Sequence, residues 1–253
     1  MKLFNQAKGW GDSLKRLEND EDYYGEFGKQ FLSQSDLKTL LTNPKEFKVD
    51  REDNKAFAEG RYFHQAFLEP DKAKVFPTLD VASRNTKLYR EWKEENDGEF
   101  ILLTKEKDAT DEMVKAMKQN FEFYDRIYRD GNKYEVPGVA MIKGYPFKGK
   151  ADILCDDCVI DLKTSANIMD FKWTSRKYNY DAQAFIYQFI FGKPLKFYVI
   201  DKTTHILGRF NPTPEWVKGG ERKVEKAIEV YEKFFGINAV EDVSNFIIEE
   251  DLE

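Results

Sequence analysis

The pattern of apolar and polar positions divides the chain into a mainly helical first part and a second part that alternates strands and helices. Over 32–47, apolar residues recur at helical spacing, Ser35 is the expected N-cap and Pro44 the expected end. The same periodicity predicts further helices over 54–68, 86–96 and 110–129. Within 54–68 we expect the aromatic side chains to face the core, namely Phe57, Tyr62 or Phe63, and Phe67.

The segment 110–129 carries a stripe that predicts one continuous helix, made by Met113, Met117, Phe121, Tyr124 and Tyr128. These side chains favour a role in the core over contact with a cofactor.

From about residue 134 the apolar period changes from that of a helix to that of a strand. Three successive strands are expected, over 139–143, 147–155 and 159–165. A helix closed by Gly192, two more strands over 195–202 and 204–210, and a long helix over Pro214–Phe235 follow. This order predicts an α/β fold with a central mixed β-sheet flanked by helices.

We expect one domain over residues 1–253. It has a mainly helical N-terminal part (1–133), a catalytic sheet core (134–210), and a C-terminal helix with an acidic tail (211–253).

The composition indicates the class of protein and its cellular compartment, and says less about the reaction. Of the 253 residues, 41% are hydrophobic and 34% charged, which is typical of a soluble globular protein. No apolar run approaches the roughly 18 residues of a membrane span, and the N-terminus lacks the apolar core of a secretory signal. With two cysteines, this predicts a cytoplasmic protein without a membrane partner. The net charge of −6 argues mildly against bulk attraction to nucleic acid but leaves room for a local basic groove.

The most informative stretch is Lys150–Lys163, KADILCDDCVIDLK, which predicts a β-hairpin. If Asp156 and Asp157 form a two-residue turn, Asp152 lies opposite Asp161, and strand alternation puts both on one face. Lys163 lies on that same face, two residues beyond Asp161.

Opposed carboxylates on neighbouring strands repel each other, and a divalent cation bound between them would offset that repulsion. Hard oxygen ligands suit Mg²⁺, with Mn²⁺ as the alternative. Lys163 could position or deprotonate an attacking water, or stabilise charge on a phosphorus centre. From the hairpin alone, a solvated surface cluster of Lys150, Asp152, Asp161 and Lys163 is an equally good interpretation.

Two further segments supply candidate site residues. Gln183 and Tyr187 stand four apart on one helix face, where they either pack structurally or donate hydrogen bonds to a phosphate or to the ordered water. His64 follows Gly60 by about one helical turn, and a glycine inside a helix indicates a close approach by backbone or ligand. Taken alone, His64 is more typical of a structural residue. We interpret His205, in an alternating strand, as structural.

Taken together, these segments resemble the exonuclease VIII-like branch of the PD-(D/E)XK nuclease superfamily, which is related to lambda-type exonucleases and RecB-type nuclease domains. The matching stretches span roughly residues 32 to 192, namely LSQSDLKTLLTNPKEFK, AEGRYFHQAFLEPD, GKADILCDDCVIDLKTS and YNYDAQAFIYQFIFG. Each motif is weak by itself, whereas four in this order are specific.

The resemblance implies a restriction endonuclease-like core with the order αβββαβ. It makes Asp152, Asp161, the carbonyl of Leu162, and His64 the metal ligands. Lys163, Gln183 and Tyr187 then complete the catalytic set. Relatives often carry a glutamate on the first core strand, and here the nearest acid, Glu135, falls early, before Pro137. Whether Glu135 joins the site, and whether one metal or two bind, stays open.

The resemblance also implies a magnesium-dependent DNA exonuclease that digests duplex ends, 5′ to 3′, as a ring-shaped homo-oligomer. It would supply single strands to an annealing partner in recombination, in a bacterial or phage-infected cell. The alternatives are a structure-specific or single-strand nuclease of the same fold, and a catalytically inactive DNA-binding module.

Two minor features complete the sequence picture. Arg84 and Lys177, in segments that mix cations with aromatics, are candidate DNA contacts. Cys155 and Cys158 lack the further cysteines that a zinc or iron–sulfur site needs, so we expect them only to flank the hairpin turn.

Overall fold

The central element of the fold is a five-stranded mixed sheet with the strand order β3-β4-β5-β6-β7. Its strands are β3 (Lys133–Ile142), β4 (Tyr145–Leu154), β5 (Val159–Ser165), β6 (Leu195–Asp201) and β7 (Leu207–Phe210). β5 and β6 run parallel, and the other neighbouring pairs run antiparallel. The computed structural model describes residues 9–50 and 52–248, so the predicted acidic end at 249–253 lies outside the described residues.

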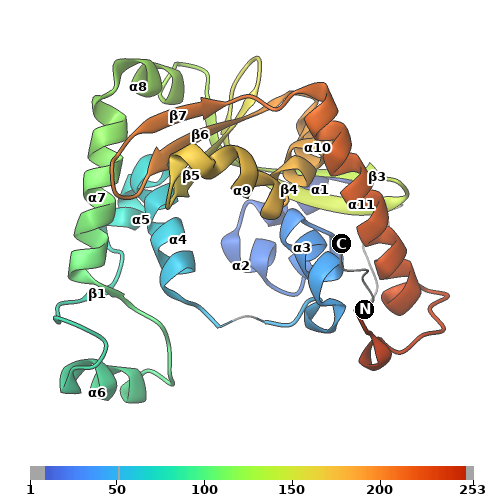
Figure 1. Cartoon of the computed structure of the whole chain (residues 1–253), viewed down its shortest axis with the longest axis horizontal. Helices are drawn as coiled ribbons and strands as arrows, with labels where there is room; N and C mark the ends of the chain where they lie inside the picture. Colours follow the sequence, from blue (N-terminus) through green and yellow to red (C-terminus); the bar gives the residue numbers. More distant parts are fainter. Residues whose placement is uncertain (1–8, 51, 249–253) are drawn as a thin grey trace.

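Helices cover both faces of this sheet, as Figure 1 shows. One face packs against α3 (Gln34–Thr42), α10 (Tyr180–Phe191) and α11 (Pro214–Phe235). The opposite face packs against α4 (Lys55–Leu68), α7 (Thr104–Gln119) and α8 (Phe121–Ile127). The predicted α/β architecture with a mixed central sheet is therefore confirmed.

Shorter elements surround this core. They are α1 (Gly11–Leu17), α2 (Asp20–Tyr24), α5 (Pro70–Lys74), α6 (Lys87–Glu95), α9 (Phe171–Lys177), and the parallel pair β1 (Thr78–Leu79) and β2 (Leu102–Leu103). Single 3₁₀ turns lie at Gly28–Gln30, Pro44–Glu46, Ile168–Asp170 and Val243–Asn245.

The helix α10 is held against the sheet from behind by α11. Its residues from Asp181 to Tyr187 are all buried, as expected for a helix that is apolar on most sides. α10 ends at Gly192 with φ 65°, as predicted, because glycine adopts this left-handed conformation without strain. At Gly220 the backbones of α11 and α10 approach so closely that a Cβ there would lie 2.0 Å from the carbonyl oxygen of Asp181.

The structure corrects the prediction of one helix over 110–129. The chain forms α7 and α8 with a break at Asn120, whose side chain accepts a hydrogen bond from the Phe123 amide and so caps α8. The break turns part of the predicted stripe outward, and Phe121 is 79% exposed.

Three smaller expectations were also wrong. α3 begins after Ser33 instead of Ser35, because the Ser33 hydroxyl bonds to the Asp36 side chain in the first turn. Phe57 does not face the core and is 49% exposed, since it lies at the rim of a cavity. His205, which was expected in a strand, lies with φ 55° in the connection between β6 and β7.

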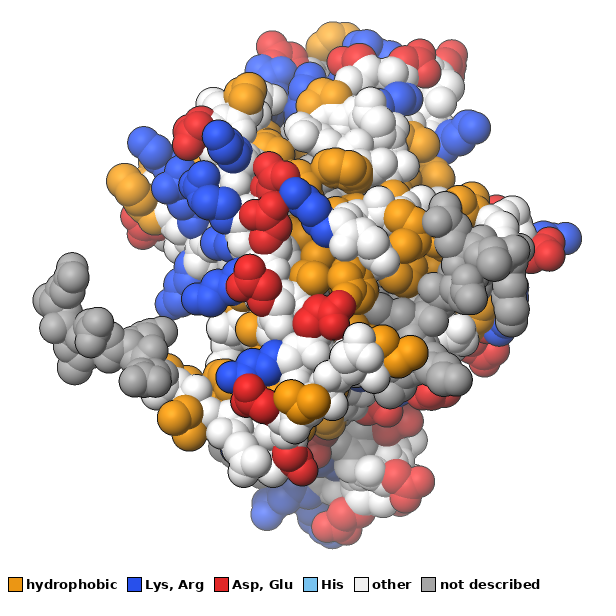
Figure 2. Space-filling view, turned by 90° about the vertical axis from the view of Figure 1, so that its right-hand side faces the viewer, with side chains coloured by type: hydrophobic (Ala, Val, Ile, Leu, Met, Phe, Trp, Pro, Cys, Tyr) orange, Lys and Arg blue, Asp and Glu red, His pale blue; other side chains and the backbone are white. Residues whose placement is uncertain are grey.

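The side of the molecule that carries α11 exposes apolar side chains together with charged ones. In Figure 2, apolar side chains gather there between charged side chains of both signs. Within residues 9–50 and 52–248, no helix has the combination of length and hydrophobicity needed to span a lipid bilayer.

Candidate active site

The predicted hairpin forms with the expected register up to the site. Ile153 pairs with Ile160 and Leu154 with Val159, and the Cys155 amide donates to the Cys158 carbonyl (2.9 Å). The ladder between β4 and β5 ends at the Ile153–Ile160 pair, one pair short of the predicted Asp152–Asp161 pair. Beyond that point the Leu162 amide donates to Asp152 Oδ2 (2.7 Å), so a side-chain carboxylate occupies the place of a backbone acceptor.

Both hairpin aspartates are buried in the wall of one cavity of about 890 Å³. Asp152 is 7% exposed and Asp161 is 2% exposed. Burying carboxylates at this level is costly unless charge partners are present. The interpretation of the hairpin as a solvated surface cluster is therefore excluded.

A group that could hold a metal ion lies at Asp152. His64 from α4, Glu135 from β3 and Asp152 from β4 offer ligand atoms that all lie within 4.8 Å of one another. His64 Nδ1 is 3.4 Å from Asp152 Oδ2. Imidazole nitrogen and carboxylate oxygens are ordinary ligands of a divalent cation.

Glu135, whose role the sequence left open, lies at the site. It stands opposite Asp152 on β3, between the pairs Tyr134–Ile153 and Val136–Ala151. The sequence placed it too early because Pro137 suggested that the strand had not yet begun. β3 is an edge strand, where proline is tolerated, so the strand runs through Pro137. Glu135 has φ 51°, a left-handed conformation that is strained for a non-glycine residue and concentrates at functional sites.

Asp161 is held between two side chains. Its Oδ1 accepts a hydrogen bond from Gln183 Nε2 (2.5 Å), and its Oδ2 lies 2.5 Å from Lys163 Nζ. Among the described residues, this buried Oδ2 makes the ion pair with Lys163 and accepts no other hydrogen bond. That oxygen can serve as a further ligand, and the donor set of His64, Glu135, Asp152 and Asp161 fits a divalent cation.

The Gln–Tyr motif of α10 acts on the hairpin instead of pointing freely into the cavity. Gln183 orients Asp161, and the Tyr187 hydroxyl donates to the Lys150 carbonyl (2.9 Å). In this structure both side chains position the strands that carry the carboxylates. Leu162, the predicted carbonyl ligand, lies between Asp161 and Lys163 in β5, and its ligand role stays a prediction.

The charges of the site compensate one another. Burial and the neighbouring Asp152 raise the pKa of Glu135 to about 7. Burial opposes the charge on His64, but the Asp152 carboxylate outweighs it and raises the pKa of His64 to about 9. Burial also disfavours ionisation of Asp152, yet His64 and Lys163 lower its pKa. A divalent cation, which binds neutral imidazole and ionised carboxylates, would take over this compensation.

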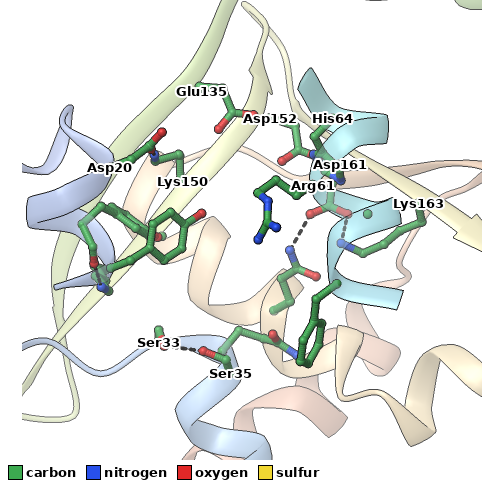
Figure 3. Close-up of a pocket in the computed structure, with 18 of the residues that line it drawn as sticks. Asp20, Ser33, Ser35, Arg61, His64, Glu135, Lys150, Asp152, Asp161 and Lys163 are labelled. Carbon is green, nitrogen blue, oxygen red and sulfur yellow. Dashed lines mark hydrogen bonds and ion pairs between the residues drawn. The ribbon is translucent and has the colours of Figure 1, made fainter. Parts of the chain in front are cut away.

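The rest of the cavity wall combines cations with aromatic rings, as Figure 3 shows in part. Lys150 on β4 is 9% exposed and lies 2.6 Å from Asp20 of α2. Arg61 reaches in from α4, one turn before His64. Tyr24, Phe57 and Tyr180 also line the cavity. Arg61 is not among the site residues predicted from the sequence, although its spacing of three from His64 places both on one helix face.

The two predicted DNA contacts lie elsewhere. Arg84 forms a paired contact with buried Glu106, with both nitrogen–oxygen distances 2.6 Å. Lys177 is the exposed last residue of α9. Neither residue is in the wall of the cavity, and their contact with DNA stays a prediction.

Comparison with known proteins assigns this fold. The chain is similar to a crystal structure of a protein from Eubacterium rectale that is provisionally assigned as an exonuclease. The two share 18% identity at a TM-score of 0.61, over 93% of this chain and 96% of the other. A second match, to the crystal structure of SSO0001, has 19% identity over 68% of this chain and 85% of the other, but its TM-score of 0.31 carries no weight. No curated protein sequence matches the chain.

A family model matches residues 29–233, a range that contains the hairpin, α10, His64 and Glu135. The model describes a PDDEXK-like domain, in agreement with the mixed sheet and the Asp152, Asp161 and Lys163 set. The chain belongs to the family of PDDEXK-like domains of unknown function, DUF3799.

Proposed function

We propose that this protein is a magnesium-dependent deoxyribonuclease that hydrolyses phosphodiester bonds from the ends of duplex DNA. The observation that supports this most is the convergence of His64, Glu135 and Asp152 with the Asp161–Lys163 pair in one cavity. The fold shared with a provisionally assigned exonuclease favours an end-directed reaction. The exonuclease VIII-like branch, 5′ to 3′ polarity, a ring-shaped oligomer and an annealing partner belong to the same proposal.

Each side chain has a distinct task in this reaction. A bound Mg²⁺ would lower the pKa of water and polarise the phosphate. His64, Glu135, Asp152 and Asp161 would hold that ion. Lys163 brings a positive charge next to Asp161, where it stabilises negative charge on the phosphate oxygens. Gln183 holds Asp161 in place, and Tyr187 holds β4 through the Lys150 carbonyl.

The experiment is digestion of linear duplex DNA labelled at either 5′ end, with Mg²⁺ or with EDTA, beside a closed-circular duplex. Lys163→Ala is the test variant, and Lys115→Ala, an exposed lysine on α7 that pairs with Glu112, is its matched control. We expect Mg²⁺-dependent loss of linear DNA by wild type and by Lys115→Ala, with circles spared and Lys163→Ala at least 100-fold slower.

Other outcomes would change the proposal in defined ways. Cleavage of the circles would keep the active site and remove the end-directed assignment. DNA binding without cleavage in Mg²⁺ or Mn²⁺ would refute the enzyme and favour an inactive binding module.

A further inference from the structure

One face of α4 is directed into the cavity instead of the core. The residues of this face are Phe57, Gly60, Arg61 and His64, which all line the cavity. The opposite face carries the buried side chains Ala58, Tyr62, Phe63 and Phe67. Only His64 has a task in the proposed reaction, so the other three cavity-facing residues need an explanation.

Gly60 is the first unexplained residue. It lies inside a 14-residue helix, where glycine costs roughly 0.5–1 kcal/mol relative to alanine. Its φ is not positive, and a Cβ built there would meet no atom within 4 Å. Neither backbone conformation nor packing within the described protein requires a glycine here. The space in front of Gly60 is open cavity. A side chain at this position would therefore obstruct a molecule bound in the cavity.

Arg61 is the second. Its side chain is 51% exposed, and Figure 3 shows its guanidinium directed into the cavity. Within the described part of the chain, its guanidinium pairs with Asp53 through one nitrogen at 2.5 Å and lies 5.9 Å from the centroid of the Phe76 ring. A guanidinium has five N–H donors in a planar fork, so most of its donors remain available. The fork matches two oxygens of a phosphate.

Phe57 is the third, one turn before Arg61. An aromatic side chain that is 49% exposed at the rim of a charged cavity loses apolar burial for no gain within the protein. Aromatic rings beside a nucleic-acid backbone are stacking platforms for unpaired bases. The spacing Phe57, Arg61, His64 follows one helix face, so base, phosphate and metal contacts would lie in a row.

Resting on the proposed nuclease function, we propose that this face of α4 binds an unpaired DNA strand next to the scissile phosphate. Phe57 stacks on a base, Arg61 binds the adjoining phosphate through its free N–H groups, and Gly60 leaves the space through which the strand backbone passes. The substrate in the cavity is accordingly a single strand, which a duplex supplies by fraying at its end.

The test measures binding of a fluorescein-labelled oligothymidylate by anisotropy, with Mg²⁺, in the Lys163→Ala background, at several salt concentrations. We expect Arg61→Ala to bind about tenfold more weakly and to reduce the slope of log affinity against log salt by about 0.7, the value for one phosphate on a single strand. Phe57→Ala should weaken binding about fivefold or more without changing that slope. Gly60→Ala should weaken binding although its folded state is more stable.

Three matched controls change the same residue types at positions outside the cavity. Arg129→Ala removes an arginine that is 53% exposed and paired with Asp125, and Phe121→Ala removes a phenylalanine that is 79% exposed. Gly219→Ala adds a methyl group inside α11, where the nearest atoms lie at 3.7 Å, an ordinary contact distance. All three should bind the oligonucleotide as the parent does.

The outcomes separate this inference from the proposed function. If the parent binds and the wild type cleaves DNA, while the Phe57, Gly60 and Arg61 variants match their controls, the α4 inference is overturned and the nuclease stands. If wild type neither binds nor cleaves DNA, the nuclease itself fails. In wild-type background, Arg61→Ala should raise KM more than it lowers kcat, because the contact is made before the reaction; an unchanged KM would also overturn the inference.

Discussion

The close contact between α10 and α11 can be tested with two neighbouring glycines of one helix. A Cβ at Gly220 would lie 2.0 Å from the Asp181 carbonyl oxygen and 2.6 Å from the Ala182 amide nitrogen, both rigid backbone atoms. Ordinary contact begins at 3.4 Å, so α11 would have to move by about 1.4 Å. At Gly219 the nearest atoms lie at 3.7 Å, and a methyl group fits.

The two substitutions should therefore change stability in opposite directions. Gly219→Ala should stabilise the protein by roughly 0.5–1 kcal/mol, because alanine loses less backbone entropy in a helix. Gly220→Ala gains the same propensity but forces the helices apart, at a cost near the upper end of the roughly 1–3 kcal/mol of overpacking. Because the propensity gain is common to both, the difference of about 3 kcal/mol reports the close contact alone.

Thermal and urea unfolding of both variants measure this difference. For a chain of this length roughly 2–4 °C correspond to 1 kcal/mol, so the two midpoints should differ by roughly 6–12 °C. Gly220→Ala should also lose nuclease activity well below its midpoint, because α10 carries Gln183 and its 2.5 Å contact with Asp161. Equal stability of the two variants would refute the reasoning that backbone contact fixes α10.

Three further predictions concern single side chains. Saturating Mg²⁺, at about 100 times its Kd, should add about 2.7 kcal/mol to the stability of wild type and raise its unfolding midpoint by roughly 5–11 °C in a calorimetric scan. Glu135→Gln should lose most of this shift, and an equal shift would mean that Glu135 is no ligand. Asp201, which accepts the amides of Ile168, Thr203 and Thr204, should cost about 2–3 kcal/mol when replaced by Asn. Because those amides lower the pKa of Asp201 to about 2, this stabilisation is present above pH about 4 and is lost as the pH falls through about 2. Urea unfolding should therefore show a large difference in stability between wild type and Asp201→Asn at pH 7 and a small difference at pH 2. Burial and the nearby Lys48 lower the pKa of Lys148 to about 7. Between pH 7 and 10 the unfolded chain therefore binds one more proton than the folded chain, and the free energy of unfolding rises with pH in that window. Lys148→Met should abolish this part of the rise, and an unchanged pH dependence would contradict the prediction.

The parts of the site that lie on regular elements were predictable from local periodicity. Strand alternation placed Asp152, Asp161 and Lys163 on one side of the hairpin, and the structure brings all three into the cavity wall. The stop at Gly192 and the bounds of α11 followed from residue types that act locally. These signals succeed because each depends on neighbours within a few positions.

Two of the predictions that failed have tertiary causes. Phe57 has the polarity of a core residue and the right spacing, and only the position of the cavity shows that it stays exposed. Pro137 argued against a strand around Glu135, and the sequence carries no local sign that this strand lies at the sheet edge. The Asn120 break was readable, since asparagine before Phe121 is a good helix cap, but the continuous apolar stripe outweighed it.

The early end of the β4–β5 ladder divides the five-stranded sheet into two parts. The first part is the β3–β4 ribbon, which carries Glu135 and Asp152. The second part is β5, β6 and β7, in which β5 carries Asp161 and Lys163. Two backbone pairs at the turn end join the two parts. Beyond these pairs, they are connected by the Leu162 amide, which donates to Asp152, and by α10, whose Gln183 contacts Asp161 and whose Tyr187 contacts the Lys150 carbonyl. The candidate ligands Asp152 and Asp161 therefore lie on two parts of the sheet that two β4–β5 backbone pairs hold together. A divalent cation held by carboxylates of both parts would add a further connection between them and would stiffen the sheet at the site.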